Sequence, residues 1–440
     1  MGLRIHAAPS LYKTGVCRII SALGGVFFSV LIGRMLGPEA LGIFTFSISA
    51  AMLLILLTKH GQDKLLTKQT SILFFANSFD LLRVLIRRAV RRSAVISCGF
   101  FALVVLVPLE KIGDFISADE VAVLRILIFA VPIAGISWIL SGFFKGIHKT
   151  HIGVLLETGA FYAAASVVLL PFLFLPFEVG INWIASCFVI GCCIVLALAL
   201  SCYKRVVMKL ETPPSPSAER TPNDNRLSNH SFLPFLFIDV SNFLMQSGSF
   251  LLGGIFLSEI DLGLLRASER IVLLIAFVIS ITNAIVMPRI ASAFANNDFN
   301  NIVNHGRWAV KINILLSLPI AVVVFTVPTV VLSIFGHGFE EAYIYIWIMG
   351  AGQMINVVIG PAAIIMSMTG KERIVLMINF FGLIIACVGF PVASLCFGGI
   401  GFAVCYFGLI ILKNTACLYT VWKTMRVWYI PIPFFLTRND

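Results

Sequence analysis

The most regular feature of the chain is a series of long apolar runs separated by shorter polar segments. A helix needs about 20 predominantly apolar residues to cross a bilayer. Twelve runs meet this requirement, roughly at residues 15–34, 41–58, 93–109, 121–144, 154–177, 179–202, 232–257, 264–288, 310–335, 342–366, 374–397 and 399–421. The last two runs are joined without an intervening charge, so we expect the chain to turn at Gly398-Gly399. The pattern therefore predicts an all-α polytopic membrane protein with twelve transmembrane helices.

The composition excludes several classes of protein. Of the 440 residues, 59% are hydrophobic and only 12% are charged, and the mean hydropathy is +1.00. An average soluble domain carries about 25% charged residues. A soluble enzyme, a disordered chain and a disulfide scaffold are therefore excluded. The ten cysteines form no CxxC pair, and no GxxxxGK[ST] motif is present, so we expect no metal, no cofactor and no enzymatic site.

The basic residues are distributed unevenly between the two sides of the membrane. If the N-terminus is cytoplasmic, the cytoplasmic segments hold 25 Lys and Arg residues, and the outer loops hold two, Arg34 and Lys111. Such a bias indicates the cytoplasmic side. Both termini are therefore predicted to be cytoplasmic. The first apolar run is expected to be a retained helix, because no convincing signal-peptide cleavage site follows it. Membrane topology also explains the net charge of +11, so no nucleic-acid partner is expected.

A single long polar linker, residues 203–231, separates the sixth and seventh runs. It contains several Pro, Ser and Asn residues. We therefore expect an N-terminal six-helix lobe (1–202), a cytoplasmic linker and a C-terminal six-helix lobe (232–440).

An internal repeat supports this division. The segments LIGRMLGPEALGIFTFS and LGGIFLSEIDLGLLRAS align with an offset of 221 residues, which places Gly42 on Gly263 and Ser47 on Ser268. Because each half has an even number of spans, both halves start on the same side of the membrane. The repeat is therefore predicted to be parallel, a symmetry found in secondary transporters.

Ionisable residues inside predicted spans are candidates for function, because each costs a few kcal/mol to insert. There are eight: Arg18, Arg125, Glu157, Asp239, Arg266, Glu269, Arg270 and Lys413. Most lie within about two turns of a helix end, where they can reach the headgroups. Arg266 can also pair with Glu269 three residues later on the same helix. Lys413 is the hardest to explain in either way.

The sign of these charges favours an anionic substrate, such as a phosphate or pyrophosphate, because five of the eight are basic. Two pairs of uncharged polar residues add to them. Asn242 and Gln246 are spaced i, i+4 in the seventh span, and Gln353 and Asn356 are spaced i, i+3 in the tenth. Such pairs either bridge neighbouring helices or line a hydrophilic path for a sugar.

Three ordered segments resemble a known family. GRMLGPEALGIFTFSIS (33–49) resembles the R-x-LGPE-x-x-G signature of polysaccharide-type (O-antigen or capsule repeat-unit) flippases in the MATE-like MOP flippase superfamily. Residues 237–271 resemble the start of their C-terminal lobe. Residues 335–373 match in G-x-x-Q-x-x-N-x-x-x-GP and MTG-x-x-R. The chain lacks the two extra C-terminal helices of the related peptidoglycan-precursor flippases, so a peptidoglycan role is not expected.

The resemblance implies a V-shaped transporter of two lobes in the bacterial inner membrane. Such a protein exports an undecaprenyl-pyrophosphate-linked oligosaccharide by alternating access, for O-antigen, capsule or exopolysaccharide synthesis. The partners implied are this lipid-linked substrate, membrane lipids, a coupling H⁺ or Na⁺, and glycan polymerase or ligase components.

The resemblance also suggests roles for the residues singled out above. It implies pyrophosphate binding by basic residues of the first and eighth helices, here Arg18 with Arg270 or Arg266, to which we add Lys413. Glu157, Asp239 or Glu269 would carry the coupling ion. Asn242, Gln246, Gln353 and Asn356 would line the polar cavity.

Two alternatives remain at this point. One is a cation-coupled multidrug or small-metabolite exporter of the same fold, against which the basic bias argues. The other is a non-transporting membrane component of glycan assembly, in which Arg18 and Arg270 would be freely replaceable.

Overall fold

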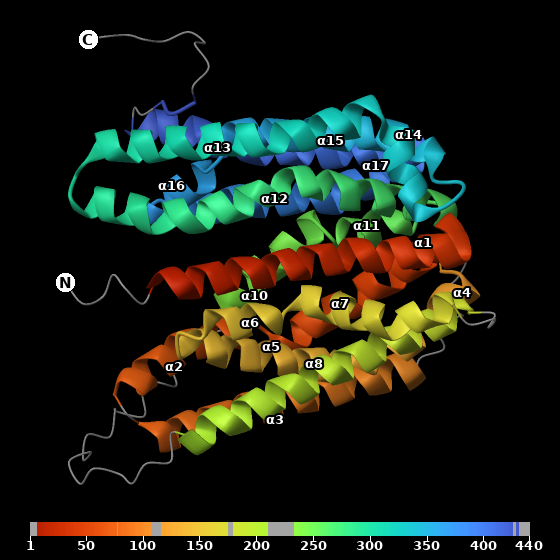
Figure 1. Ribbon diagram of the computed structural model, residues 1–440, viewed down its shortest axis with the longest axis horizontal. Coiled ribbons are helices and arrows are strands. Elements are labelled where there is room, and N and C mark those ends of the chain that lie inside the picture. The colour runs from red at the N-terminus through yellow and green to blue at the C-terminus, as the bar shows by residue number, and fades with distance from the viewer. Residues whose placement is uncertain are drawn as a thin grey trace. The chain divides into compact units, whose positions relative to one another are not determined.

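The structure is a computed structural model that describes residues 7–76, 78–106, 116–174, 179–209, 233–425 and 428–430 (Figure 1). Helices make up almost all of these residues, and none of them lies in a strand. The chain divides into two compact units. The first comprises Met1–Leu251 and Ser258–Gly263, and the second comprises Leu252–Leu257 and Leu264–Asp440.

The first unit contains most of the helices before residue 250. They are α1 (Ala7–Lys59), α2 (Gln62–Phe75), α3 (Phe79–Leu106), α4 (Ala118–Leu127), α5 (Ala130–Gly146), α6 (Thr150–Leu155), α7 (Thr158–Leu169) with the 3₁₀ turn η2 (Leu170–Leu173), α8 (Ile181–Lys209) and α10 (Leu233–Met245). A capping box starts α4, because Ser117 accepts from the Glu120 N–H and Glu120 from the Ser117 N–H.

The later elements lie mostly in the second unit. They are α11 (Ser249–Gly254), α12 (Glu259–Ala295), α13 (Phe299–Thr326), α14 (Pro328–Leu332), the 3₁₀ turns η3 (Ser333–Phe335) and η4 (Glu340–Ala342), α15 (Tyr343–Ile359), α16 (Ala362–Met368) and α17 (Glu372–Met425). Both α11 and the start of α12 include residues of the first unit.

Two of the long helices are broken where the sequence places a turn between spans. Helix α17 has a non-helical Gly398 with φ 59°, which confirms the predicted turn. Helix α1 has a similar break at Gly37, with φ 83°, between the first two predicted spans. Glycine is suited to both positions, because a left-handed φ is costly for residues that carry a Cβ.

The helices agree with the predicted membrane spans. Among the described residues, seven helices are long and apolar enough to cross a membrane, or eight if the pair α4 and α5, bent by 45°, is one span. The first of these stretches and α17 each contain two predicted runs. The seventh predicted run is interrupted, because α10 ends at Met245 and α11 begins at Ser249. The protein is therefore a multi-pass helical membrane protein.

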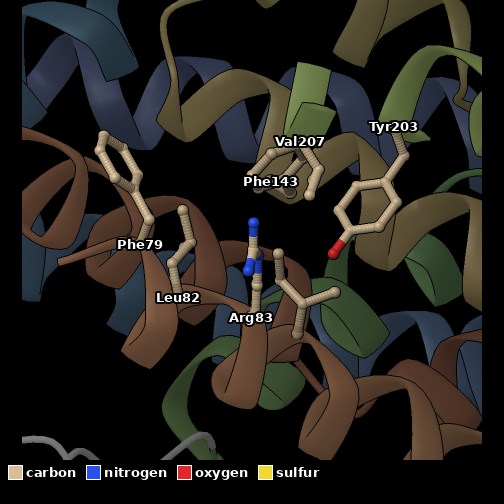
Figure 2. A pocket seen from close by; sticks show the side chains of 7 residues that line it. Phe79, Leu82, Arg83, Phe143, Tyr203 and Val207 are labelled. Carbon is tan, nitrogen blue, oxygen red and sulfur yellow. The ribbon is translucent and has the colours of Figure 1, made fainter. Parts of the chain in front are cut away.

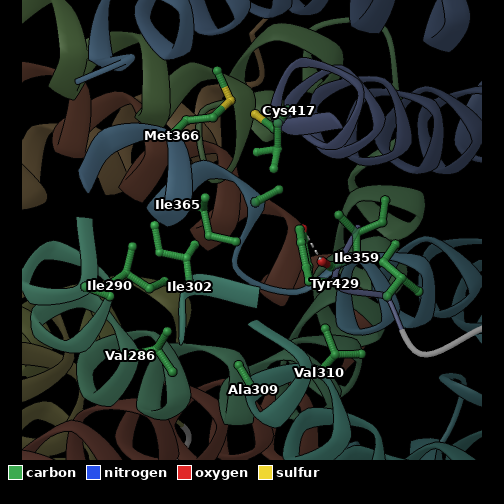
Figure 3. Close-up of a cluster of buried hydrophobic side chains, with 14 residues drawn as sticks. Val286, Ile290, Ile302, Ala309, Val310, Ile359, Ile365, Met366, Cys417 and Tyr429 are labelled. Carbon is green, nitrogen blue, oxygen red and sulfur yellow. Dashed lines mark hydrogen bonds between the residues drawn. The ribbon is translucent and has the colours of Figure 1, made fainter. Parts of the chain in front are cut away.

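The units have separate apolar cores. In the first, Phe28 of α1 stacks with Phe44, Tyr162 and Phe188 at ring-centroid distances of 5.4, 5.8 and 6.0 Å, which joins both halves of α1 to α7 and α8. In the second, buried side chains of α12, α13, α16 and α17 form a cluster (Figure 3). Its buried Tyr429 donates a hydrogen bond to the Ile359 carbonyl at 2.8 Å.

The division by packing differs in one respect from the predicted lobes. Helix α10, which follows the predicted linker, belongs to the first compact unit. Residues 210–232, which include most of the linker, lie outside the described residues. The lobe boundary at 203–231 therefore stays a prediction.

The internal repeat is visible in the hydrogen bonds of its two serines. Ser47 donates to the Ile43 carbonyl at 2.9 Å and to the Glu120 carbonyl at 3.0 Å. Ser268 donates to the Leu264 carbonyl at 2.9 Å and to the Ala342 carbonyl at 3.4 Å. The acceptors in the two sets are 221 and 222 residues apart. The repeated segments thus hold corresponding helix contacts in each unit.

The repeated glycines make reciprocal contacts within the first unit. A Cβ at Gly42 would overlap the Glu259 carbonyl oxygen, and a Cβ at Gly263 would overlap the Pro38 carbonyl oxygen. Pro38 and Glu259 are themselves 221 residues apart. The sequence repeat therefore brings two helix segments together through two glycines, where no larger residue fits.

Candidate functional site

The most deeply buried ion pair in the described residues lies on α12. The Arg266 Nη1 is 2.7 Å from the Glu269 Oε2, and the two residues are 5% and 2% exposed. The i, i+3 spacing places them on one face of the helix, which confirms the pair predicted from the sequence. Because both charges are removed from solvent, each depends strongly on the other.

Polar groups of two other helices lie near this pair. Tyr406 of α17 is 4% exposed, its hydroxyl is hydrogen-bonded to the Gln353 side chain of α15, and it lies within electrostatic range of Glu269 and Arg266. The Asn356 Nδ2 donates to the Gln353 Oε1 at 3.0 Å. Thus Gln353 and Asn356 bond to each other along α15. We call these five residues the second-unit cluster.

Two further predicted cations belong to the same unit. Arg270, one turn after Arg266 on α12, is half-buried. Lys413, on α17, is half-buried and lies near Cys417. The described residues offer Lys413 no carboxylate at ion-pair distance. A half-buried lysine without such a partner is able to bind an anion.

A second charged cluster lies in the first unit, where α1 ends and α2 begins. The Asp239 carboxylate of α10 contacts two lysines, with Oδ2 at 2.8 Å from the Lys59 Nζ and Oδ1 at 2.5 Å from the Lys64 Nζ. Lys59 also contacts the Asp63 carboxylate at 2.7 Å, and its ammonium lies 4.6 Å from the centre of the Trp138 ring. These five residues form the first-unit cluster.

Sequence reasoning identified only Asp239 in the first-unit cluster. It assigned Lys59 and Lys64 to a solvated cytoplasmic loop. The spacing of Lys59 and Asp63, i and i+4, is a local signal that could have found one of the pairs. The contacts of Asp239 join residues 175 and 180 positions apart, for which the sequence holds no local signal.

The remaining predicted site residues are spread over the first unit. Glu157 precedes α7 and forms an ion pair with Lys145 at the end of α5. Arg18 is exposed on α1. Asn242 is half-buried on α10, and Gln246 is exposed in the turn between α10 and α11, so the two are not on one continuous helix. The structure thus groups some of the predicted residues and leaves Arg18 and Gln246 at the surface.

This architecture is that of MATE-type transporters. An inward-facing multidrug resistance MATE family transporter of the MOP superfamily has a TM-score of 0.68 and 14% identity, covering 94% of this chain and 98% of its own. The MATE multidrug transporter DinF-BH scores 0.62 at 14% identity, covering 95% and 96%. A MOP superfamily transporter from Pyrococcus furiosus scores 0.59 at 13% identity, covering 95% of each chain.

The family follows from the sequence. The family model described as polysaccharide biosynthesis protein matches residues 11–294, and the MatE model matches residues 238–392. The chain therefore belongs to the polysaccharide biosynthesis protein family, within the MATE-like MOP superfamily, which confirms the resemblance given above. No curated protein sequence matches the chain significantly.

Proposed function

We propose that this protein moves a lipid-linked oligosaccharide, carried on undecaprenyl pyrophosphate, across the bacterial cytoplasmic membrane. The observation that carries the proposal is the match to the polysaccharide biosynthesis family over residues 11–294. Alternating access in a MATE-like fold supplies the movement. The 25-to-2 bias of basic residues supports cytoplasmic termini and thus loading from the cytoplasm.

The pyrophosphate would be held by the basic residues of the spans. Arg18 and Arg270 are the first candidates, since the guanidinium group matches phosphate oxygens in a bidentate way. Lys413 is the third, because a half-buried ammonium gains most from an anionic partner. Arg266 holds Glu269 in this conformation, so it can bind the substrate only if that ion pair opens.

The coupling ion, H⁺ or Na⁺, would bind a carboxylate in competition with a basic side chain. Each of the three candidates already has such a partner: Glu157 has Lys145, Asp239 has Lys59 and Lys64, and Glu269 has Arg266. Glu269 is the most buried of them, and it has Tyr406 nearby as a further polar group. Neutralising Glu269 would release Arg266, which links ion binding to the site for the anion.

The decisive experiment follows the substrate across the membrane. In a deletion strain, lipid-linked oligosaccharide should accumulate on the cytoplasmic face, so a membrane-impermeant glycan probe should fail to label it on sealed spheroplasts. Surface glycan should be lost. A normal distribution of the oligosaccharide would contradict the proposal.

Single substitutions test the anion site in the complemented strain. Arg18→Ala and Arg270→Ala should abolish surface glycan while the protein stays in the membrane at its normal level. Lys13→Ala, an exposed lysine on the same helix as Arg18 but before the predicted span, is the matched control and should keep normal glycan. Wild-type glycan levels in either arginine variant would overturn the assignment of that residue.

A cation-coupled exporter of drugs or small metabolites is the second candidate. It is favoured by the likeness to structures of multidrug MATE transporters. The same deletion strain separates the two candidates. Increased sensitivity to organic cations with normal surface glycan would favour the drug exporter.

A further inference from the structure

A shallow pocket opens between α3, α5 and α8, away from both charged clusters (Figure 2). Its walls are mostly apolar and consist of Phe79, Leu82 and Ile86 of α3, Phe143 of α5, and Val207 of α8. Two polar side chains, Arg83 and Tyr203, complete the lining. In Figure 2 the guanidinium of Arg83 and the hydroxyl of Tyr203 both extend into the space between the apolar walls.

The pocket lies at one level of the predicted membrane. The third predicted span begins at residue 93, the fourth ends at 144 and the sixth ends at 202. The lining residues 79–86, 143 and 203–207 therefore stand where three spans reach the same membrane surface. Tyrosine is enriched at this depth, because its ring is apolar and its hydroxyl is polar. By the bias of basic residues, this surface is the cytoplasmic one.

Positive charge dominates the surroundings of the pocket. Arg83, Arg87 and Arg91 are spaced i, i+4, i+8, so they form a stripe along one side of α3. Arg83 and Arg87 both lie within electrostatic range of the Tyr203 hydroxyl. The exposed Lys204 and Arg205 follow Tyr203 on α8.

A single acid on α3 offsets little of this charge. Asp80 is 3.7 Å from Arg83 at its Oδ1, and its side chain is 97% exposed. An exposed pair at this distance is worth at most about 1 kcal/mol, so it would give way to a stronger anionic partner.

We propose that this pocket binds an anionic phospholipid of the cytoplasmic leaflet by its headgroup phosphate. Arg83 and Arg87 would hold the phosphate oxygens, and the Tyr203 hydroxyl would donate to one of them. The apolar walls would contact the glycerol and the first acyl carbons. Basic pockets between helices on the cytoplasmic side are suited to such headgroups. The proposal rests on the predicted membrane depth of these helices and is independent of the transported substrate.

The test measures lipid binding to the full-length protein in detergent. Native mass spectrometry would compare phosphatidylglycerol with phosphatidylcholine of the same acyl chains. We expect saturable binding of phosphatidylglycerol and weaker binding of phosphatidylcholine. Arg83→Ala should weaken phosphatidylglycerol binding about fivefold, and the Arg83→Ala, Arg87→Ala double variant about 25-fold. Tyr203→Phe should give a smaller loss, since it removes one hydrogen bond only.

The matched control is Arg88→Ala. Arg88 is exposed on α3 but lies roughly 140° around the helix from Arg83, so it carries the same charge outside the stripe. Its variant should bind phosphatidylglycerol as the wild type does. Melting temperatures within about 2 °C of the wild type would show that the variants are folded.

Three results would overturn the proposal. They are equal binding of the two phospholipids, an equal loss in Arg88→Ala, and Arg83-dependent binding of a polyprenyl pyrophosphate with none of phosphatidylglycerol. The last result would make the pocket part of substrate handling instead of a lipid site. Loss of glycan export in a deletion strain has no bearing on any of them, so the two proposals fail separately.

Discussion

The two units share a helix framework but place buried charge in different ways. In the first unit, Asp239 receives two lysines, and Lys59 has a second carboxylate in Asp63. Either lysine therefore keeps Asp239 in an ion pair if the other is removed. In the second unit, Arg266 and Glu269 form a deeper pair on a single helix.

This difference indicates a division of labour within one architecture. The first-unit cluster joins the end of α1, the start of α2 and α10, and its partners are partly redundant, as expected of a structural contact. The second-unit cluster depends on the opposite charges of one pair, so a change of protonation or an ion at Glu269 has a large local effect. The serines Ser47 and Ser268, by contrast, keep corresponding bonds in both units.

The largest effect that separates the clusters is expected from removing a carboxylate. Glu269→Ala leaves Arg266 buried without its carboxylate and should lower the free energy of unfolding by about 3–5 kcal/mol. Asp239→Ala should cost about 1.5–3 kcal/mol, because Lys59 keeps Asp63 and the Lys64 side chain is 41% exposed. Thermal unfolding of the full-length variants in one detergent would rank the two.

Glu269→Gln is the control for this comparison. The amide keeps the shape and an acceptor for Arg266, so its loss should be smaller than that of the alanine variant. Equal melting temperatures for Glu269→Ala and Asp239→Ala would contradict the idea that the first-unit cluster is redundant.

The sequence predicted those features of the fold and site that depend on local pattern. The spans follow from apolar runs, the break at Gly398 from a glycine pair in an uncharged stretch, and the Arg266–Glu269 pair from i, i+3 spacing. The lysines that hold Asp239 were missed, because they lie 175 and 180 residues away along the chain. Helix packing alone brings them together.

Tyr406 was missed for the same reason. It lies in the last predicted span among apolar residues and resembles an ordinary membrane tyrosine. Its bond to Gln353 joins α17 to α15 and depends on how these helices pack. The break between α10 and α11 was missed because Gln246 and its neighbours continue an apolar run, and hydropathy does not register a turn inside such a run.

A smaller effect is expected at the glycines that the repeats share. Gly42→Ala and Gly263→Ala each force a Cβ against a backbone carbonyl oxygen, which cannot rotate away as a side chain would. Overpacking of this kind typically costs about 1–3 kcal/mol. Both variants should melt at lower temperature by a similar amount, because the contacts are reciprocal.

Gly99→Ala is the matched control for the glycine pair. Gly99 lies within α3, and a Cβ there would meet nothing within 4 Å. Alanine is favoured over glycine inside a helix by roughly 0.5–1 kcal/mol, so this variant should be as stable as the wild type or more so. If Gly42→Ala also left the melting temperature unchanged, close packing of the repeated segments would be refuted.

The smallest effect, and the finest test of the comparison, concerns the two serines. Ser47→Ala and Ser268→Ala each remove a buried hydroxyl, at a cost of about 0.5–1.5 kcal/mol. The cost should be greater for Ser47, because its bond to the second carbonyl is 3.0 Å long and that of Ser268 is 3.4 Å long. The bonds to the carbonyl four residues earlier are 2.9 Å in both copies, so they cancel in the comparison. A larger loss for Ser268→Ala in paired thermal melts would mean that the second copy depends on its serine more than the hydrogen-bond lengths indicate.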